Sequence, residues 1–269
     1  MVESDRYRTL PTSDELPDSD GLPVDNEEQN LLPNYLLFLL QFIWPERYDW
    51  YFAVDMGIYH LTGVNPRVPV VPDGFLSLGI PRRKPGRRFR KSYVTWEEDG
   101  IAPILLLEVV SQTPGGEYDN KRAIYQNLGV LYYVIYNPEY WQRDRHQPFE
   151  VYKLIEGEYR LQLGEPYWMP EVGLGLGRFQ GELAGIEQEL LSWFDQQGQR
   201  YLSATEQASQ AQQQALQAQQ QALQAEAAVQ TERQARLSAV QRLQQMGLSA
   251  EQIAAALGLS IEVVTQHLE

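Results

Sequence analysis

The run Ile104-Leu105-Leu106-Leu107-Glu108-Val109-Val110 decides the fold of this chain, because it has the length and composition of a fully buried strand. Glu108 is the one charged residue in this run. An ionised carboxylate is costly to bury unless it is paired with a cation or binds a metal ion. We therefore predict a functional role for Glu108.

The residues that follow this strand predict a crossover to a second, parallel strand. Residues 119–128 have apolar side chains at helical spacing, and Gly129 can end that helix. Another apolar run of strand length follows at 131–136. A strand, a helix and a strand in this order favour parallel neighbours in a sheet that is covered by helices.

The flanking sequence extends this unit into an α/β domain. Leu and Tyr recur at helical spacing from about Glu27 to Ile43, and Pro33 delays the start of that helix or kinks it. Four further segments have the composition of strands, and the last two flank a turn as the arms of a hairpin do: 50–58, 68–78, 149–155 and 159–163.

Changes in composition divide the 269 residues into four parts. Residues 1–24 are rich in Asp, Glu, Ser, Thr and Pro, which predicts a disordered acidic leader. The folded domain spans residues 25–201. Residues 202–246 are rich in Gln and Ala and contain one seven-residue unit twice in succession, which predicts a long helix. Residues 247–269 have the spacing of a helix-turn-helix hairpin.

The helix at 202–246 is predicted to form a weak coiled coil that pairs two chains. Leu216, Leu223 and Leu237 share one heptad position, but Gln230 interrupts the series, so a lone solvated helix is the alternative. The terminal hairpin has no Lys or Arg on its second helix. Docking of a protein on this hairpin is therefore as well supported as contact with DNA.

Composition limits the classes of site and partner. The chain has no cysteine and three distant histidines, which argues against disulfides and against a zinc site. We find neither a signal peptide nor an apolar stretch long enough to span a membrane. We therefore expect a cytoplasmic protein with no membrane partner.

The net charge of −14 opposes a nucleic-acid partner, but the basic residues are unevenly distributed. Seven of the 22 Lys and Arg residues lie between positions 82 and 91, in a loop marked by Pro and Gly. This loop is either a solvated, flexible segment or a surface that contacts phosphates. The residues assigned to nucleic-acid binding are Arg82, Arg83, Lys84, Arg87, Arg88, Arg90 and Lys91.

Asp73 and Glu108 are the predicted metal ligands. Hydrolysis of a phosphodiester requires neutralising the charge that develops on the phosphoryl oxygens and activating a water, which Mg²⁺ held by carboxylates can do. Mg²⁺ favours oxygen ligands and keeps several waters, so two acidic residues on adjacent strands suffice, and Mn²⁺ is the other candidate ion. Lys121 follows the Glu108 strand along the chain and can orient the attacking water.

Each of these residues has a structural alternative. Asp73 can hydrogen-bond the backbone of its own turn, Glu108 can pair with a buried Arg or Lys, and Lys121 can lie on an exposed helix face. Further carboxylates that can join the site or cap a helix are Asp55, Glu28 and Asp119.

Motifs around these residues occur in a specific order: Val71-Pro72-Asp73-Gly74, Leu107-Glu108-Val109-Val110-Ser111, Asp119 with Lys121 and Tyr125, and the run from Gly129 to Pro138. Residues 25–200 resemble a bacterial family of restriction-endonuclease-like proteins, the Uma-type restriction endonuclease domain of the PD-(D/E)XK nuclease superfamily. The resemblance implies a central mixed sheet flanked by helices, two acidic metal ligands on neighbouring strands, and Mg²⁺-dependent cleavage of DNA. It also implies that the Val109 carbonyl is offered to the metal.

Two positions depart from the family pattern. The superfamily lysine normally sits two residues after the acidic residue, where this chain has Val110. The resemblance transfers its role to Lys121 on the following helix, and Gln112 is the alternative for positioning water. Asn137 stands where an aspartate is expected before a proline.

The predicted activity is that of a metal-dependent endodeoxyribonuclease in which Asp73 and Glu108 bind the metal and Lys121 orients the water. The alternative is a catalytically inactive binding or scaffold protein that keeps the nuclease fold and oligomerises through its C-terminal helix.

Overall fold

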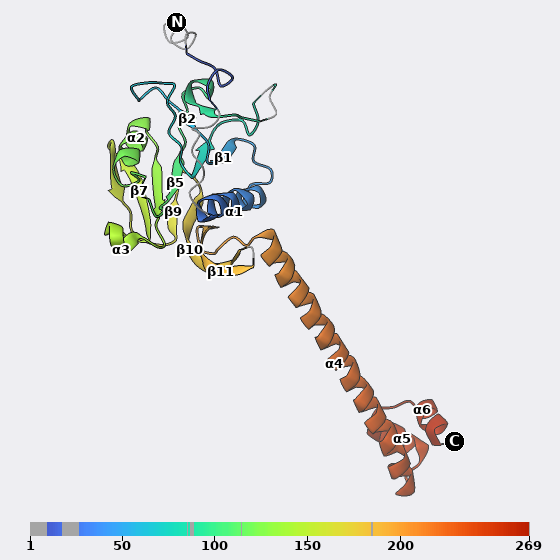
Figure 1. Cartoon of the computed structure of the whole chain (residues 1–269). Helices are drawn as coiled ribbons and strands as arrows, with labels where there is room; N and C mark the ends of the chain where they lie inside the picture. Colours follow the sequence, from blue (N-terminus) through green and yellow to red (C-terminus); the bar gives the residue numbers. More distant parts are fainter. Residues whose placement is uncertain are drawn as a thin grey trace. The chain divides into compact units, whose positions relative to one another are not determined.

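The structure is a computed structural model of the whole chain, and it describes residues 10–17, 27–84, 86, 89–113, 115–183 and 185–268 (Figure 1). It divides into two compact units, Met1–Ser203 and Ala204–Glu269. The first unit is a mixed α/β domain and the second is helical, so the predicted fold class is confirmed.

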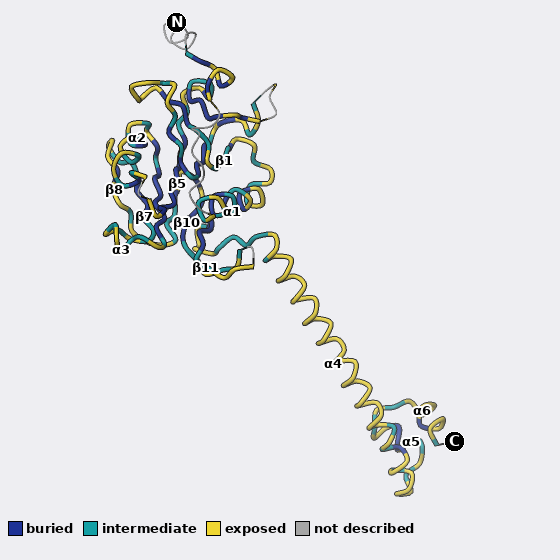
Figure 2. Tube along the Cα trace, viewed as in Figure 1, coloured by how far each residue is buried: buried dark blue, intermediate teal, exposed yellow. Residues whose placement is uncertain are grey.

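A six-stranded mixed sheet forms the centre of the first unit, with the strand order β1-β3-β5-β6-β7-β8. β5 and β6 are parallel and are joined by helix α2 (Asn120–Leu128), as the sequence predicted, and the other neighbouring pairs are antiparallel. Every residue of β5 is buried (Figure 2). The strands are β1 (Trp50–Val54), β3 (Gly74–Leu78), β5 (Leu105–Val109), β6 (Tyr132–Tyr136), β7 (Phe149–Ile155) and β8 (Glu158–Leu161).

Helix α1 (Glu27–Ile43) and a three-stranded antiparallel sheet cover one face of the central sheet. The indole Nε1 of Trp193 donates a hydrogen bond to the Leu36 carbonyl oxygen at 3.0 Å, which joins the two covering elements. The strands of this second sheet are β9 (Tyr167–Met169), β10 (Leu174–Leu183) and β11 (Ile186–Phe194).

Helix α2 and a short parallel pair of strands cover the opposite face. Their core is rich in aromatic side chains, among them Phe75, Tyr125 and Tyr133. Gly129 ends α2 with a φ of 80°, in the left-handed region that glycine adopts without strain. The remaining short elements are β2 (Ile58–Tyr59), β4 (Tyr93–Val94), η1 (Thr95–Glu97) and α3 (Trp141–Asp144).

Part of the N-terminal segment packs on the domain, in contrast to the disordered leader that the composition predicted. The Trp96 indole donates to the Pro11 carbonyl oxygen at 2.9 Å, and the Tyr59 hydroxyl donates to the Pro17 carbonyl oxygen at 2.7 Å. Ser13 and Leu16 are buried. Aromatic donors of the domain thus bind the backbone of residues 10–17, whereas the rest of the predicted leader lies outside the described residues.

The second unit begins with helix α4 (Ala204–Gln245), which is exposed along most of its length (Figure 2). The hairpin of α5 (Ala250–Leu257) and α6 (Ile261–Leu268) packs on the end of α4. Ser249 starts α5 with a capping box that is completed by Gln252. Among the described residues, no helix is long and apolar enough to cross a membrane.

Candidate active site

Strand register brings the two predicted metal ligands together. Asp73 immediately precedes β3, and Glu108 is the fourth residue of β5. Gly74 pairs with Leu107 in the antiparallel ladder, which places Asp73 beside Glu108. The Val109 amide donates to Asp73 Oδ2 at 2.6 Å, so the carboxylate of Asp73 is fixed against β5.

Helix α2 supplies two partners to the Glu108 carboxylate. Lys121 Nζ lies 2.8 Å from Glu108 Oε2, and the Tyr125 hydroxyl donates to Glu108 Oε1 in a short hydrogen bond. Lys121 and Tyr125 are four residues apart, which puts them on one face of the helix. Glu108 itself is only 1% exposed, so each carboxylate oxygen depends on a protein partner.

Burial and mutual repulsion govern the protonation of the two carboxylates. Burial, followed by the neighbouring Glu108 charge, raises the pKa of Asp73 to about 8, against the opposing effects of the Val109 amide and Lys121. Burial also raises the pKa of Glu108, against the effect of Lys121 and Tyr125. For Lys121, burial acts to lower the pKa, but the charge of Glu108 outweighs it and the pKa is raised. Lys121 is therefore a cation at neutral pH.

The donor set fits a hard divalent cation. The ladder places Asp73 beside Glu108, and the Glu108 charge acts on the Asp73 carboxyl, so the two carboxyl groups can face one ion. The Val109 carbonyl oxygen accepts from Gln29 Nε2 at 3.0 Å, and its second lone pair makes it a further oxygen donor. Within the described ranges there is no group of three or more His, Asp or Glu residues suited to a metal. Two carboxylates, a carbonyl and waters form a set that Mg²⁺ accepts.

The further carboxylates take other positions. Asp55 is exposed at the end of β1, where its amide donates to the Asp73 carbonyl oxygen at 3.1 Å. Glu28 lines a separate cavity of about 460 Å³, where burial and the charges of Glu139 and Glu189 raise its pKa to about 7. Asp119 stands at the N-cap position of α2, but its side chain makes no capping hydrogen bond there.

Gln112, the alternative for positioning water, lines the Glu28 cavity and not the pair of carboxylates. Its carbonyl oxygen accepts from Arg143 Nη1 at 2.7 Å, which ties the loop after β5 to α3. Val110 is buried on the aromatic face of the sheet, beside Tyr125. Lys121 therefore approaches Glu108 from the face toward which the side chain at position 110 points.

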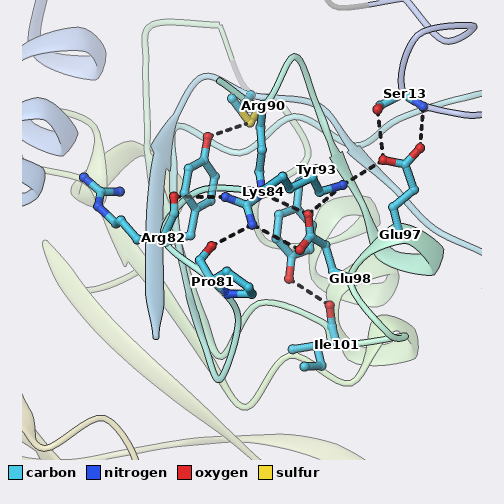
Figure 3. Close-up of polar contacts among 11 residues, drawn as sticks. Ser13, Pro81, Arg82, Lys84, Arg90, Tyr93, Glu97, Glu98 and Ile101 are labelled. Carbon is cyan, nitrogen blue, oxygen red and sulfur yellow. Dashed lines mark hydrogen bonds and ion pairs between the residues drawn. The ribbon is translucent and has the colours of Figure 1, made fainter. Parts of the chain in front are cut away.

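Much of the basic loop serves the structure of the domain (Figure 3). Arg90 is buried in an ion pair with Glu98, with Nε and Oε1 2.9 Å apart, and Lys84 Nζ lies 2.7 Å from Glu97 and 2.9 Å from Glu98. Lys91 forms an exposed pair with Asp14 at 3.4 Å.

The side chains of Arg82 and Arg83, the other described cations of the loop, have different surroundings. The guanidinium of Arg82 stacks over the Trp50 ring at 4.1 Å, and Arg83 lines a groove beside it. Nucleic-acid binding by this pair stays a prediction. Arg87 and Arg88, also assigned to nucleic-acid binding, lie outside the described residues.

Tyr125 is a site residue to which the sequence analysis gave no role. It is buried, and its ring meets Tyr133 edge to face at a centroid distance of 5.1 Å. The sequence feature that could have identified Tyr125 is its spacing of four residues from Lys121 on one helix. A tyrosine at such a position is more often a core residue, so the spacing alone did not assign it to Glu108.

Comparison with protein families agrees with this geometry. Residues 22–184 match the Uma2 family model, which is described as "Putative restriction endonuclease" and is consistent with the PD-(D/E)XK superfamily. No significant match was found among curated proteins or among solved structures. The match covers more than half of the chain, and the chain therefore belongs to the Uma2 restriction-endonuclease-like family.

Proposed function

We propose that the chain is a Mg²⁺-dependent endonuclease that hydrolyses phosphodiester bonds of DNA in the cytoplasm. The observation that carries the proposal is the meeting of Asp73 and Glu108 on adjacent strands, with Lys121 in contact with Glu108. The family adds independent support, because its description is that of a restriction endonuclease.

Each side chain has a definite part in this proposal. Asp73 and Glu108 would hold the metal, which when bound would neutralise the charge that develops on the phosphoryl group. Lys121 donates one hydrogen bond to Glu108, and its ammonium has further N–H donors that can orient the attacking water. Tyr125 fixes the orientation of the Glu108 carboxylate.

Cleavage of supercoiled plasmid in Mg²⁺ or Mn²⁺ tests the proposal. We expect metal-dependent nicking or linearisation by the wild-type chain, and its loss in Asp73→Asn and Glu108→Gln. Asp195→Asn is a matched control, because Asp195 follows β11 and accepts backbone hydrogen bonds in its own turn. Equal cleavage by the wild type and Glu108→Gln would refute the proposal.

A second candidate function is a nuclease-fold binding or scaffold protein without turnover. The observation that favours it is the engagement of both Glu108 oxygens by Lys121 and Tyr125, together with Val110 at the position of the superfamily lysine. A folded wild-type protein that binds Mn²⁺ but cleaves neither plasmid nor single-stranded DNA would establish this candidate instead.

We also propose that helix α4 pairs two chains, because cutting both strands of a duplex requires two sites. Leu216 and Leu223 are seven residues apart and are 50% and 59% exposed, so both can face a second helix at the same heptad position. Light scattering after size exclusion should give the mass of a dimer for the wild type. It should give the mass of a monomer for the helix-compatible double variant Leu216→Gln/Leu223→Gln, and a wild-type monomer would refute the pairing.

A further inference from the structure

An open groove of about 810 Å³ lies beside the basic loop, and the proposed function does not use it. Its walls include the aromatic rings of Tyr48 and Phe89 and the side chains of Arg82 and Arg83. The Tyr51 ring lines it as well. Large aromatic and cationic side chains thus surround one open space.

The two wall aromatics are unusually exposed for their size. Tyr48 is 72% exposed and Phe89 is 80% exposed. Large aromatic side chains normally contribute their area to a core, so exposed rings along one groove indicate a surface that binds a partner. An aromatic face suits a planar π-system, and every nucleobase offers one.

The groove rests on a rigid base that the buried ion pairs provide (Figure 3). The Arg90 guanidinium lies 4.4 Å from the centre of the Tyr51 ring and pairs with buried Glu98. It also donates to the carbonyl oxygens of Pro81 at 2.8 Å and Arg82 at 3.2 Å. Arg90 therefore fixes both the floor of the groove and the backbone of one wall.

Among the described residues, two cations of the groove have no carboxylate partner. Lys84 and Arg90 are balanced by Glu97 and Glu98. In the part of the chain that the structure describes, Arg82 and Arg83 form no ion pair with a carboxylate. The Trp50 ring holds the Arg82 guanidinium in place at 4.1 Å, so this cation is presented in a fixed position. Fixed cations beside exposed rings suit a chain of phosphates with bases attached.

The groove lies on the same face of the central sheet as the candidate active site. Tyr51 pairs with Ser77 in the ladder of β1 and β3, and its ring meets Phe75, whose core also holds Tyr125. Ser77 is four residues beyond Asp73, which is about 13 Å at the rise of a strand.

We propose that this groove binds unstacked bases of a single-stranded segment, so that the substrate contains unpaired nucleotides a few positions from the scissile phosphate. Tyr48 and Phe89 stack on the bases, and Arg82 and Arg83 contact the phosphates. Bases of an intact duplex hide their faces in the stack, so only unpaired bases can use these rings. This inference rests on the proposed function and specifies the class of its substrate.

The test is a binding measurement without metal, so that no cleavage occurs. Fluorescence anisotropy compares a labelled oligothymidylate with a blunt duplex of the same length, in EDTA. The variants are Tyr48→Ala, Phe89→Ala, Phe89→Trp and Arg83→Gln. Phe42→Ala is the matched control, because Phe42 is an exposed phenylalanine on α1, which covers the opposite face.

We expect the wild type to bind the single strand more tightly than the duplex. Tyr48→Ala and Phe89→Ala should each weaken single-strand binding by about 10-fold, within the range of a lost base stack. Phe89→Trp should retain single-strand binding. Duplex binding should not change in any of these three aromatic variants. Arg83→Gln should weaken the binding of both the single strand and the duplex. It should also reduce the slope of log affinity against log salt concentration by about one counterion.

Two results would overturn the inference. The first is single-strand affinity in Phe89→Ala equal to that of Phe42→Ala and the wild type. The second is tighter binding of the duplex than of the single strand. Neither result depends on catalysis. If the protein gives either result and still cleaves DNA, only the groove proposal is refuted. If it prefers the single strand but cleaves no DNA, only the proposed nuclease function is refuted.

Discussion

Lys121 Nζ lies 2.8 Å from Glu108 Oε2, and this ion pair joins the crossover helix to the middle of the central sheet. Glu108 is almost inaccessible, whereas Lys121 is 25% exposed in its side chain. The lysine thus compensates a buried charge and still reaches the protein surface. In the proposed mechanism, α2 would therefore supply the lysine that β5 lacks.

Lys121→Gln should destabilise the protein because it leaves the Glu108 charge buried without its cation. We expect a loss of about 3 kcal/mol in the free energy of unfolding, measured by denaturant titration. Lys153→Gln is the matched control, since Lys153 pairs with the more exposed Glu171, and it should cost less than about 1 kcal/mol. The double variant Glu108→Gln/Lys121→Gln should recover part of the loss. Equal stability of the two lysine variants would contradict the burial argument.

Tyr125→Phe should keep the aromatic packing and remove only the hydroxyl that holds Glu108. We expect Mn²⁺ affinity, measured by titration calorimetry, to fall by about 10-fold or more, as for other residues that orient a metal ligand. Tyr133→Phe is a control in the same core, because the Tyr133 hydroxyl donates to the Glu117 backbone and not to a carboxylate of the site. If both variants bind Mn²⁺ as the wild type does, Tyr125 has no positioning role.

Asp73 makes the stability of the metal-free protein depend on pH. Its pKa is raised in the folded protein from an ordinary 3.8 to about 8, chiefly by burial. Between these values the folded state binds more protons than the unfolded state, so this group lowers stability as pH rises. Asp73→Asn cannot ionise, so the variant should become more stable relative to the wild type from pH 5 to pH 8. Parallel melting-temperature curves in EDTA would contradict the raised pKa.

Leu16→Ala tests the packing of residues 10–17 on the domain. Leu16 is buried with Tyr59 and Val94, so its truncation should lower the free energy of unfolding by about 2 kcal/mol. Leu61→Ala, which truncates a half-exposed leucine, should have little effect. A disordered leader would instead make the two variants equally stable.

The parallel pair of strands at the centre of the sheet followed from local sequence patterns. The apolar runs at Glu108 and at 131–136, with Gly129 between helix and strand, predicted the parallel pair that the structure shows. The second sheet was not predicted, because β10 places Gly175 and Gly177 where a strand pattern needs side chains. A Cβ atom at Gly177 would lie 2.8 Å from Pro166 Cα, so glycine is required there for close packing.

The candidate site was predictable only in part. The sequence predicted Asp73, Glu108 and Lys121 as site residues. Their contacts depend on strand register and on the angle of α2, and no local sequence pattern encodes either. The same limit applies to the basic loop. A run of Lys and Arg suggests phosphate contacts, whereas the burial of Arg90 with Glu98 depends on a fold that brings η1 beside the loop.

The most direct test is Mn²⁺ titration of the metal-free protein, with plasmid cleavage measured in the same samples. We predict that a single ion binds each wild-type chain, that cleavage rises with the occupancy of this ion, and that Asp73→Asn loses both binding and cleavage. Binding of Mn²⁺ that is unchanged in Asp73→Asn, or full occupancy without any cleavage, would contradict a metal-dependent nuclease built on Asp73 and Glu108.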